Sequence, residues 1–144
     1  MRYLKILLMA LTFGLQLPAL AAGIPVTLFK NPNCTCCNAW AKHLEANGFK
    51  VQIVNTTDLA SISRKYGVPE NLEGCHTALV DGYVVEGLVP VRYIKRLLKE
   101  HPLVKGIALP GMPLGVPGMP GTKSGPLNIY YVDASAPPRV FASF

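Results

Sequence analysis

The sequence predicts a single α/β domain whose first helix begins at a cluster of thiols. Three observations support this prediction. Short apolar segments have the pattern of strands, segments with helical spacing lie between them, and three of the four cysteines fall within four residues, Cys34-Thr35-Cys36-Cys37. The expected order is β-α-β-α-β-β-α, followed by a Gly/Pro/Met-rich C-terminal loop.

The first 22 residues have the pattern of a secretory signal peptide. Arg2 and Lys5 precede an apolar run over residues 6–17, which is short for a membrane span, and the small-x-small pattern at 19–21 resembles a cleavage site. We therefore expect residues 1–22 to be removed and 23–144 to form one domain with no membrane span. A retained N-terminal anchor is the alternative.

The first half of the domain reads as strand, helix, strand. Val26 to Phe29 is an apolar strand, and a turn over residues 30–33 leads into a helix from about Cys36 to Asn47. Ala39, Trp40 and Leu44 form the apolar stripe of this helix, with Trp40 expected in the core. Asn47-Gly48 has the pattern of a helix end, and Phe49 to Val54 alternates as the second strand.

The second half adds a short helix, a hairpin and a longer helix. Asp58 is a good N-cap for the short helix, and Asp81-Gly82 is a typical hairpin turn. The predicted elements are the helix 59–66, a loop over 69–74, the strands 77–80 and 83–89, and the helix 91–100.

This order is that of the thioredoxin fold, in which a helix N-terminus carries reactive thiols. The partial positive charge at a helix N-terminus stabilises a thiolate. In that fold the loop before the hairpin packs against the thiol-bearing end of the helix, and here that loop is residues 73–77. We therefore expect Cys75 and His76 to lie close to Cys34, Cys36 and Cys37.

Glycine and proline dominate residues 106–126, which predicts a loop without helix or strand. Within this loop Gly111-Met112-Pro113 recurs as Gly118-Met119-Pro120. The methionine thioether is a soft ligand suited to Cu(I). The alternative is a surface linker whose methionines fill gaps. Residues 127–144 are expected to form one strand, at 127–132, and a tail of no predicted structure.

The cysteine spacing favours a metal cluster over a single ion or structural disulfides. Four thiolates would suit one zinc ion, but the adjacent Cys36 and Cys37 are difficult to fit around a single tetrahedral ion. Bridging thiolates in a polynuclear Cu(I) cluster fit this packing better. Structural disulfides are the usual interpretation of an even cysteine count in an exported protein. Disulfides among clustered cysteines, however, would close only very short loops.

The charge of the chain is mildly basic and scattered. The formal net charge of +6 falls to +4 without Arg2 and Lys5. The densest set of basic residues consists of Arg92, Lys95, Arg96 and Lys99. It has the spacing of a solvated helix face and does not predict a nucleic-acid site.

His43 is expected at a solvated position of its helix, and His101 is expected at a helix end.

Four segments together resemble the CopG-type periplasmic copper-resistance proteins: residues 29–40, 74–77, 82–87 and 110–113. The resemblance extends over about residues 24–122. It implies a thioredoxin-like domain in the periplasm that binds several copper ions, mainly as Cu(I), and acts in copper tolerance. The implied partners are copper ions and periplasmic copper carriers or efflux components. The implied thiolate ligands are Cys34, Cys36, Cys37 and Cys75, and the softer outer ligands are Met112, Met119 and His76.

Two enzymatic alternatives remain open. Cys34 and Cys37 have the Cys-x-x-Cys spacing of a protein thiol–disulfide oxidoreductase, but Cys75-His76-Thr77 occupies the position where such enzymes carry a proline. A copper oxidoreductase would instead couple a dithiol to the Cu(II)/Cu(I) change. It predicts a Cys34–Cys37 or a Cys36–Cys75 disulfide in the oxidised, metal-free protein.

Overall fold

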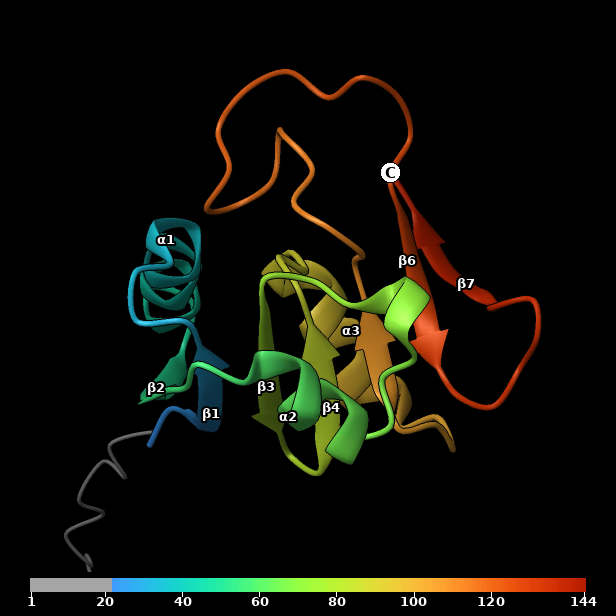
Figure 1. The fold of residues 1–144 in the computed structure, drawn as a ribbon, viewed down its shortest axis with the longest axis horizontal. Helices are drawn as coiled ribbons and strands as arrows, with labels where there is room; N and C mark the ends of the chain where they lie inside the picture. Colours follow the sequence, from blue (N-terminus) through green and yellow to red (C-terminus); the bar gives the residue numbers. More distant parts are fainter. Residues whose placement is uncertain (1–21) are drawn as a thin grey trace, which may run out of the picture.

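A computed structural model describes residues 22–144, so the predicted signal peptide at 1–22 lies almost wholly outside the described residues. Those residues form a mixed α/β fold with one sheet of seven strands (Figure 1). This confirms the predicted α/β class. None of the helices in the described part of the chain has the length and apolarity that a membrane crossing requires.

The helices and strands follow one another along the whole described chain. Their order is β1 (Ile24–Lys30), α1 (Thr35–Glu45), β2 (Phe49–Asn55), α2 (Leu59–Lys65), the 3-10 turn η1 (Glu70–Leu72), β3 (His76–Val80), β4 (Tyr83–Glu86), α3 (Val91–Glu100), β5 (Gly106–Ala108), β6 (Asn128–Val132) and β7 (Val140–Ser143).

The sheet topology explains why distant cysteines meet. The strand order is β2-β1-β3-β4-β5-β6-β7, with β1 parallel to β2 and antiparallel to β3. In the β1–β3 register Lys30 lies opposite His76, so β1 ends where β3 begins. The segment that follows β1 and the segment that precedes β3 therefore leave the sheet at the same edge.

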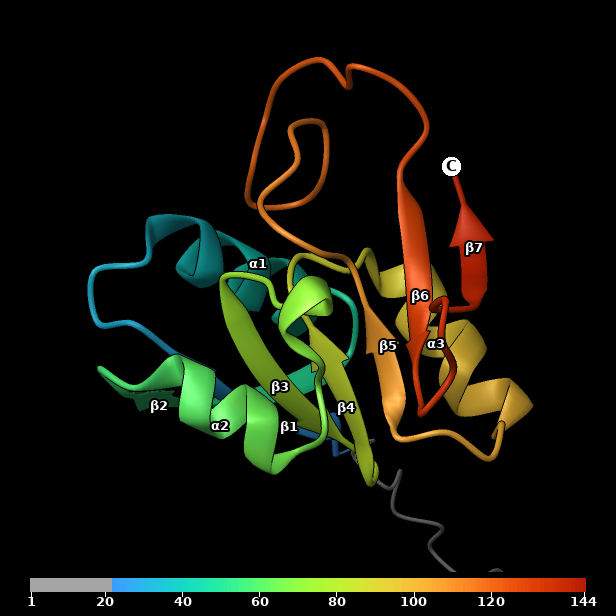
Figure 2. The same cartoon turned by 45° about the vertical axis from the view of Figure 1, so that its right-hand side comes forward.

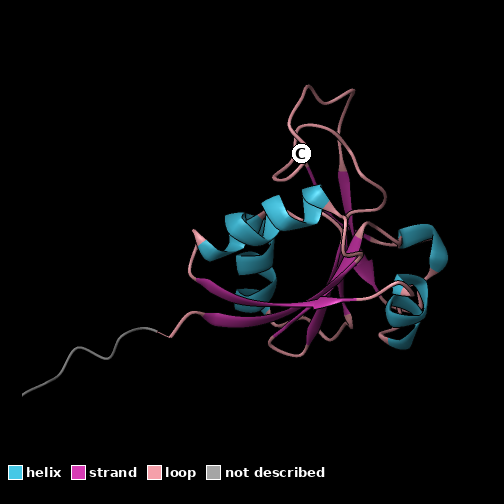
Figure 3. Cartoon of the chain, turned by 60° about the vertical axis from the view of Figure 1, so that its left-hand side comes forward, coloured by secondary structure: helices cyan, strands magenta, loops and turns pink. Residues whose placement is uncertain are grey.

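Helices cover both faces of the sheet (Figure 3). The larger core packs α1 and α3 against one face, with Trp40, Leu44 and Ile94 fully buried. The Trp40 indole also donates a hydrogen bond to the carbonyl oxygen of Val89 at 2.9 Å, which satisfies its one polar atom and confirms its place in the core. A smaller core lies around Val68, Leu72, Val84, Ala108 and Val132.

Two strands lie where the sequence predicts none. Gly106 to Ala108 form β5 inside the predicted loop 106–126, so that prediction was wrong there. Residues 140–143 form β7 in the tail, for which the sequence makes no prediction. Pairing, and not local propensity, makes both strands. β5 lies between β4 and β6, and β7 packs on β6 through the Tyr131 and Phe141 rings, whose centroids are 5.1 Å apart.

The remainder of the predicted loop has no long element. Residues 109–127 leave β5, arch beyond the edge of the sheet and return to β6 (Figures 1 and 2). Within this arch Gly74 and Gly111 form an isolated parallel bridge, and Gly111 donates a backbone hydrogen bond to the Glu73 carbonyl at 2.9 Å. The arch is thereby attached to the segment that carries Cys75.

Candidate metal centre

The three clustered cysteines occupy the first turn of α1. Cys34 is the N-cap residue, and its sulfur accepts a hydrogen bond from the backbone N–H of Cys37 at 3.3 Å. Cys37 is buried, whereas Cys34 and Cys36 are half-buried. The sulfur atoms therefore lie at the N-terminus of the helix, where the first backbone N–H groups have no partner within the helix.

Cys75 completes the group from the loop before β3. Its Sγ lies 3.7 Å from Cys36 Sγ, and its carbonyl oxygen lies 3.3 Å from Cys37 Sγ. The Sγ atoms of Cys34, Cys36, Cys37 and Cys75 all lie within 4.8 Å of one another. The proximity predicted from the sequence is confirmed, and four convergent sulfurs are a donor set that fits a soft metal ion.

The four sulfurs are in two redox states. Cys34 and Cys37 form a disulfide across three positions of sequence, with Cα atoms 5.3 Å apart. Cys36 and Cys75 are free thiols. Of the two disulfides that the sequence left open, the structure contains Cys34–Cys37. All four sulfurs become available as thiolates only after that bond is reduced.

Burial makes the Cys75 thiol hard to ionise. Desolvation, followed by the neighbouring Cys36, raises the pKa of Cys75 to about 12. Cys75 therefore holds its proton at neutral pH in the metal-free protein. A cation at this position would reverse that preference, because metal coordination deprotonates a thiol.

His76 is fully buried beside the cluster. Its Nδ1 lies 3.4 Å from Cys75 Sγ, and its ring packs on Trp40 with centroids 4.2 Å apart. Burial lowers the pKa of His76 to about 3, so the ring is neutral. The other ring nitrogen, Nε2, is buried and has no hydrogen-bond partner among the described residues.

The two methionines of the arch each follow a glycine that contacts a cysteine-bearing segment, but they differ in exposure. Met112 follows Gly111, which is bonded to the Cys75 segment, and its side chain is 58% exposed. Met119 is half-buried and packs against the larger core, as Cys36 and Cys75 do. Gly118 (φ +97°) fits there because a Cβ atom would lie 2.6 Å from the Cys36 carbonyl oxygen.

Lys30 supports the cysteine loop and was not singled out from the sequence. Its side chain is 3% exposed, and its ammonium donates hydrogen bonds to the carbonyl oxygens of Asn31 and Pro32 at 3.1 and 3.3 Å. A lysine that ends an apolar strand directly before the Cys-x-Cys-Cys segment is the available sequence signal.

Glu86 supports the other side of the cluster and was also missed. It is fully buried, and its Oε1 accepts the backbone N–H of Gly74 at 2.8 Å, while Oε2 has no partner among the described residues. Burial raises the pKa of Glu86 to about 7. The sequence signal is a single carboxylate within the apolar hairpin strand 83–89.

Comparison with known proteins gives one family model and two solved structures. Residues 72–119 match the family described as "Protein of unknown function, DUF411". Two structures titled "Copper resistance protein copG", Form 1 and Form 2, each align over 85% of this chain and 98% of theirs, with 37% sequence identity and a TM-score of 0.77. No curated protein matches the sequence.

Proposed function

The chain belongs to the family of CopG copper resistance proteins, and we propose that it binds copper through its four cysteines in the service of copper tolerance. The observation that carries the proposal is the convergence of four Sγ atoms within 4.8 Å from two segments about forty residues apart in sequence. Such a set is larger than one disulfide needs and is built from the donors that copper prefers.

The copper is held mainly as Cu(I). Thiolate is a soft ligand, and a donor set made of thiolates selects a soft monovalent ion over harder divalent ones. The adjacency of Cys36 and Cys37, with Cys34 two residues before Cys36, favours thiolates that bridge several ions over four thiolates around one. We therefore propose a polynuclear site on Cys34, Cys36, Cys37 and Cys75.

His76, Met112 and Met119 support the thiolates in this proposal. His76 Nδ1 lies 3.4 Å from Cys75 Sγ. In the tautomer protonated at Nδ1, it would donate a hydrogen bond that orients the Cys75 thiolate. The methionines are neutral sulfur donors on the arch that lies against Cys36 and the Cys75 segment. They close the outer side of the site, Met119 from a half-buried position and Met112 from an exposed one.

The framework around the site is proposed to be thioredoxin-like. The run from β1 to α3 has the order β-α-β-α-β-β-α, and β2, β1, β3 and β4 are neighbours in the sheet in that sequence. The leader pattern of residues 1–22 supports export, and we place the protein in the periplasm. Copper carriers or efflux components there are its proposed partners.

A second candidate function is copper oxidation and reduction, and the Cys34–Cys37 disulfide favours it. In this reaction two Cu(II) ions each gain one electron. The Cys34 and Cys37 thiols together lose two electrons and two protons and form the S–S bond. Reduction of that disulfide by an external dithiol would complete a cycle.

A Cu(I) titration of the reduced protein tests the primary proposal. The chain is reduced, kept anaerobic and titrated with Cu(I) against a competing chelator, and copper per chain is measured after desalting. We expect two or more coppers per chain, fewer in Cys75→Ser, and no change in Thr35→Ser, which alters an exposed residue of the same segment. Retention of full copper by Cys75→Ser would contradict the proposed site.

Activity on protein disulfides is the remaining alternative. The Cys34 and Cys37 pair has the required spacing, so an insulin reduction assay with dithiothreitol distinguishes the two functions. We expect no turnover above the background of the reductant. Turnover that is lost in Cys37→Ser, in a protein that retains no copper, would instead assign the chain to the protein oxidoreductases.

A further inference from the structure

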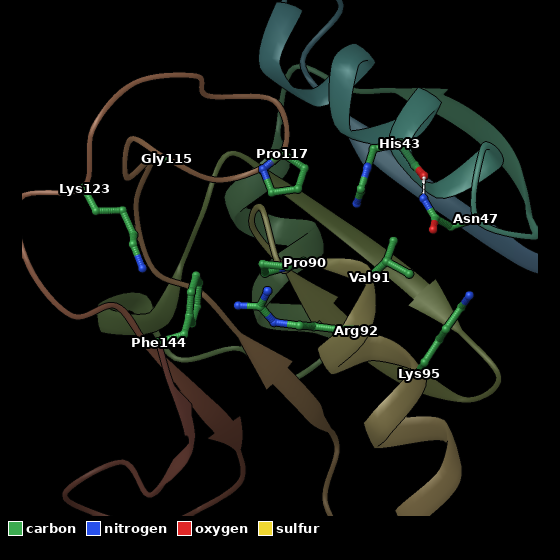
Figure 4. Close-up of a pocket in the computed structure, with 10 residues that line it drawn as sticks. All are labelled: His43, Asn47, Pro90, Val91, Arg92, Lys95, Gly115, Pro117, Lys123 and Phe144. Atoms are coloured by element: carbon green, nitrogen blue, oxygen red, sulfur yellow. Dashed lines mark hydrogen bonds between the residues drawn. The ribbon is translucent and has the colours of Figure 1, made fainter.

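A cavity of about 540 Å³ lies beside the arch. The close-up in Figure 4 shows side chains from four separate parts of the chain around it. They come from the end of α1 and the residues just after it, the start of α3, the arch and the C-terminal residue. The side chains that matter for its chemistry are His43, Asn47, Arg92, Lys95, Lys123 and Phe144.

The cavity is distinct from the cysteine cluster although α1 links the two. His43 lies seven residues after Cys36, two helical turns along the same face, which corresponds to about 10 Å along the axis. None of the four cysteines lines the cavity. A ligand bound there would therefore occupy a neighbouring site and would not compete for the sulfurs.

Among the side chains that line the cavity, three are cationic and none is anionic. Arg92, Lys95 and Lys123 face the cavity, and none of its lining residues is an aspartate or glutamate. Within residues 22–144 the salt bridges are Arg96–Glu100 and Arg139–Asp133, both outside the lining. Cations gathered at one concavity raise the local concentration of anions more strongly than scattered ones do.

The basic residues of α3 are exposed, as the sequence predicts, and the structure adds the cavity that two of them border. Of the four basic residues on α3, Arg92 and Lys95 line the cavity, while Arg96 pairs with Glu100 at 2.7 Å on the exposed surface. Lys123 comes from the arch, far along the chain, and joins them. Tertiary structure therefore brings cations together that helical spacing alone would leave dispersed.

Aromatic rings hold two of these cations in place. The Arg92 guanidinium lies over the Tyr93 and Phe144 rings, 4.7 and 5.2 Å from their centroids, and donates a hydrogen bond to the Tyr93 hydroxyl at 3.1 Å. The Lys123 ammonium lies 4.8 Å from the Phe144 centroid. A stacked guanidinium keeps its N–H edge free for a carboxylate, and its restricted motion lowers the entropy lost on binding.

The start of α3 adds to the positive potential. Pro90 is the N-cap residue of this ten-residue helix and gives it no side-chain hydrogen bond. Pro90, Val91 and Arg92 line the cavity, so the uncapped first turn of the helix borders it. The partial positive charge of a helix N-terminus therefore acts in the same direction as the three cations.

We propose that this cavity binds a small organic anion with two or more carboxylate groups. The cations come from separate elements, which suits negative charges spaced along a ligand better than a single compact anion. The volume lies in the range of small-molecule sites, and a phosphate ion would leave most of it empty. The Arg92 guanidinium can bind a carboxylate through two parallel N–H groups, and the Phe144 ring can contact the carbon skeleton that carries it.

Calorimetric titration of the full metal-free chain with citrate, acetate and inorganic phosphate tests this site. We expect one citrate per chain, with affinity that falls as sodium chloride is added, and weaker binding of phosphate and acetate. Lys95→Gln and Lys123→Gln should each weaken citrate binding by about two- to fivefold. Lys99→Gln, which removes a charge from α3 outside the cavity, should leave it unchanged.

Three results would overturn the proposal. They are an absence of citrate binding, phosphate binding tighter than citrate, and an equal loss in Lys99→Gln and Lys123→Gln, which would indicate attraction by net charge alone. Thermal unfolding of each variant confirms that it is folded. Citrate binding in Cys36→Ser should equal that of the unmodified chain, so the outcome does not depend on whether the thiols bind copper.

Discussion

Glu86 is a buried carboxyl group with a direct link to the loop that carries Cys75. Its pKa is raised from 4.5 to about 7 by burial, so the folded protein holds a proton that the unfolded chain releases. The free energy of unfolding therefore falls as pH rises from about 4.5 through about 7, by at most about 3 kcal/mol. We predict that Glu86→Gln, which keeps an oxygen for the Gly74 N–H, removes this fall.

Urea unfolding at about pH 5 and about pH 8 measures the effect. His76, whose pKa is lowered to about 3, acts in the opposite direction below its ordinary value, since stability is lost as pH falls and the buried ring must be charged. The comparison is therefore the difference between the variant and the unmodified chain at each pH, in which the His76 contribution cancels. Parallel pH profiles would contradict the proposed protonation of Glu86.

Lys30 supplies a second prediction at single-residue level. Lys30→Met keeps the buried aliphatic stem but removes the ammonium that bonds Asn31 and Pro32. We expect the free energy of unfolding to fall by about 1–3 kcal/mol and the free thiol of Cys36 to react faster with a thiol reagent. Lys50→Met, an exposed position on β2, is the control and should change neither quantity.

The cysteines could be predicted from the sequence, and their supporting residues could not. Close spacing of Cys34, Cys36 and Cys37 is visible in one dimension, and the fold order pointed to Cys75. Lys30 and Glu86 are single charged residues at the ends of strands, where exposure is the ordinary expectation. Only the β1–β3 and β3–β4 registers reveal that both side chains are enclosed beside the cluster.

The arch between β5 and β6 is the element whose role is most open to direct test. Met112→Leu and Met119→Leu remove a thioether while keeping the side-chain volume, so stability should change by less than about 1.5 kcal/mol. We predict weaker Cu(I) affinity in both variants, measured by chelator competition, with the larger loss at the half-buried Met119. Leu114→Ile, within the same arch, is the control. Unchanged Cu(I) affinity in both methionine variants would show that the methionine sulfurs do not contribute to copper binding.

Gly118 tests whether the arch must rest on α1. A Cβ atom there would lie 2.6 Å from the Cys36 carbonyl oxygen, and the φ of +97° disfavours other residues. Gly118→Ala should therefore displace the arch and increase the reactivity of Cys36, measured by thiol labelling. Gly125→Ala, where a Cβ atom meets nothing within 4 Å, is the matched control. Equal labelling of the two variants would show that the arch does not shield Cys36.

At the level of elements, helix and hairpin patterns predicted more than the C-terminal segment did. The α3 helix has the predicted bounds, because its apolar positions recur at helical spacing. β5 has three residues, one of them Gly106, and no periodicity can identify so short a strand. Its existence depends on β4 and β6, which are paired to it on either side.

Across the whole molecule, the sheet brings one disulfide-bonded pair and two free thiols to one edge. Reduction of the Cys34–Cys37 bond should raise the number of free thiols per chain, titrated after unfolding, from two to four. We predict that the oxidised protein retains fewer copper ions than the reduced protein, measured by metal analysis after desalting. Equal copper retention in the two forms would exclude Cys34 and Cys37 from the site.

The most direct test of a thiolate copper centre is X-ray absorption at the copper edge on the reduced, Cu(I)-loaded chain. We predict an edge typical of Cu(I), sulfur as the main ligand and a copper–copper distance consistent with bridging thiolates. A first shell made only of nitrogen or oxygen, with all four thiols still titratable, would contradict the assignment of copper to Cys34, Cys36, Cys37 and Cys75.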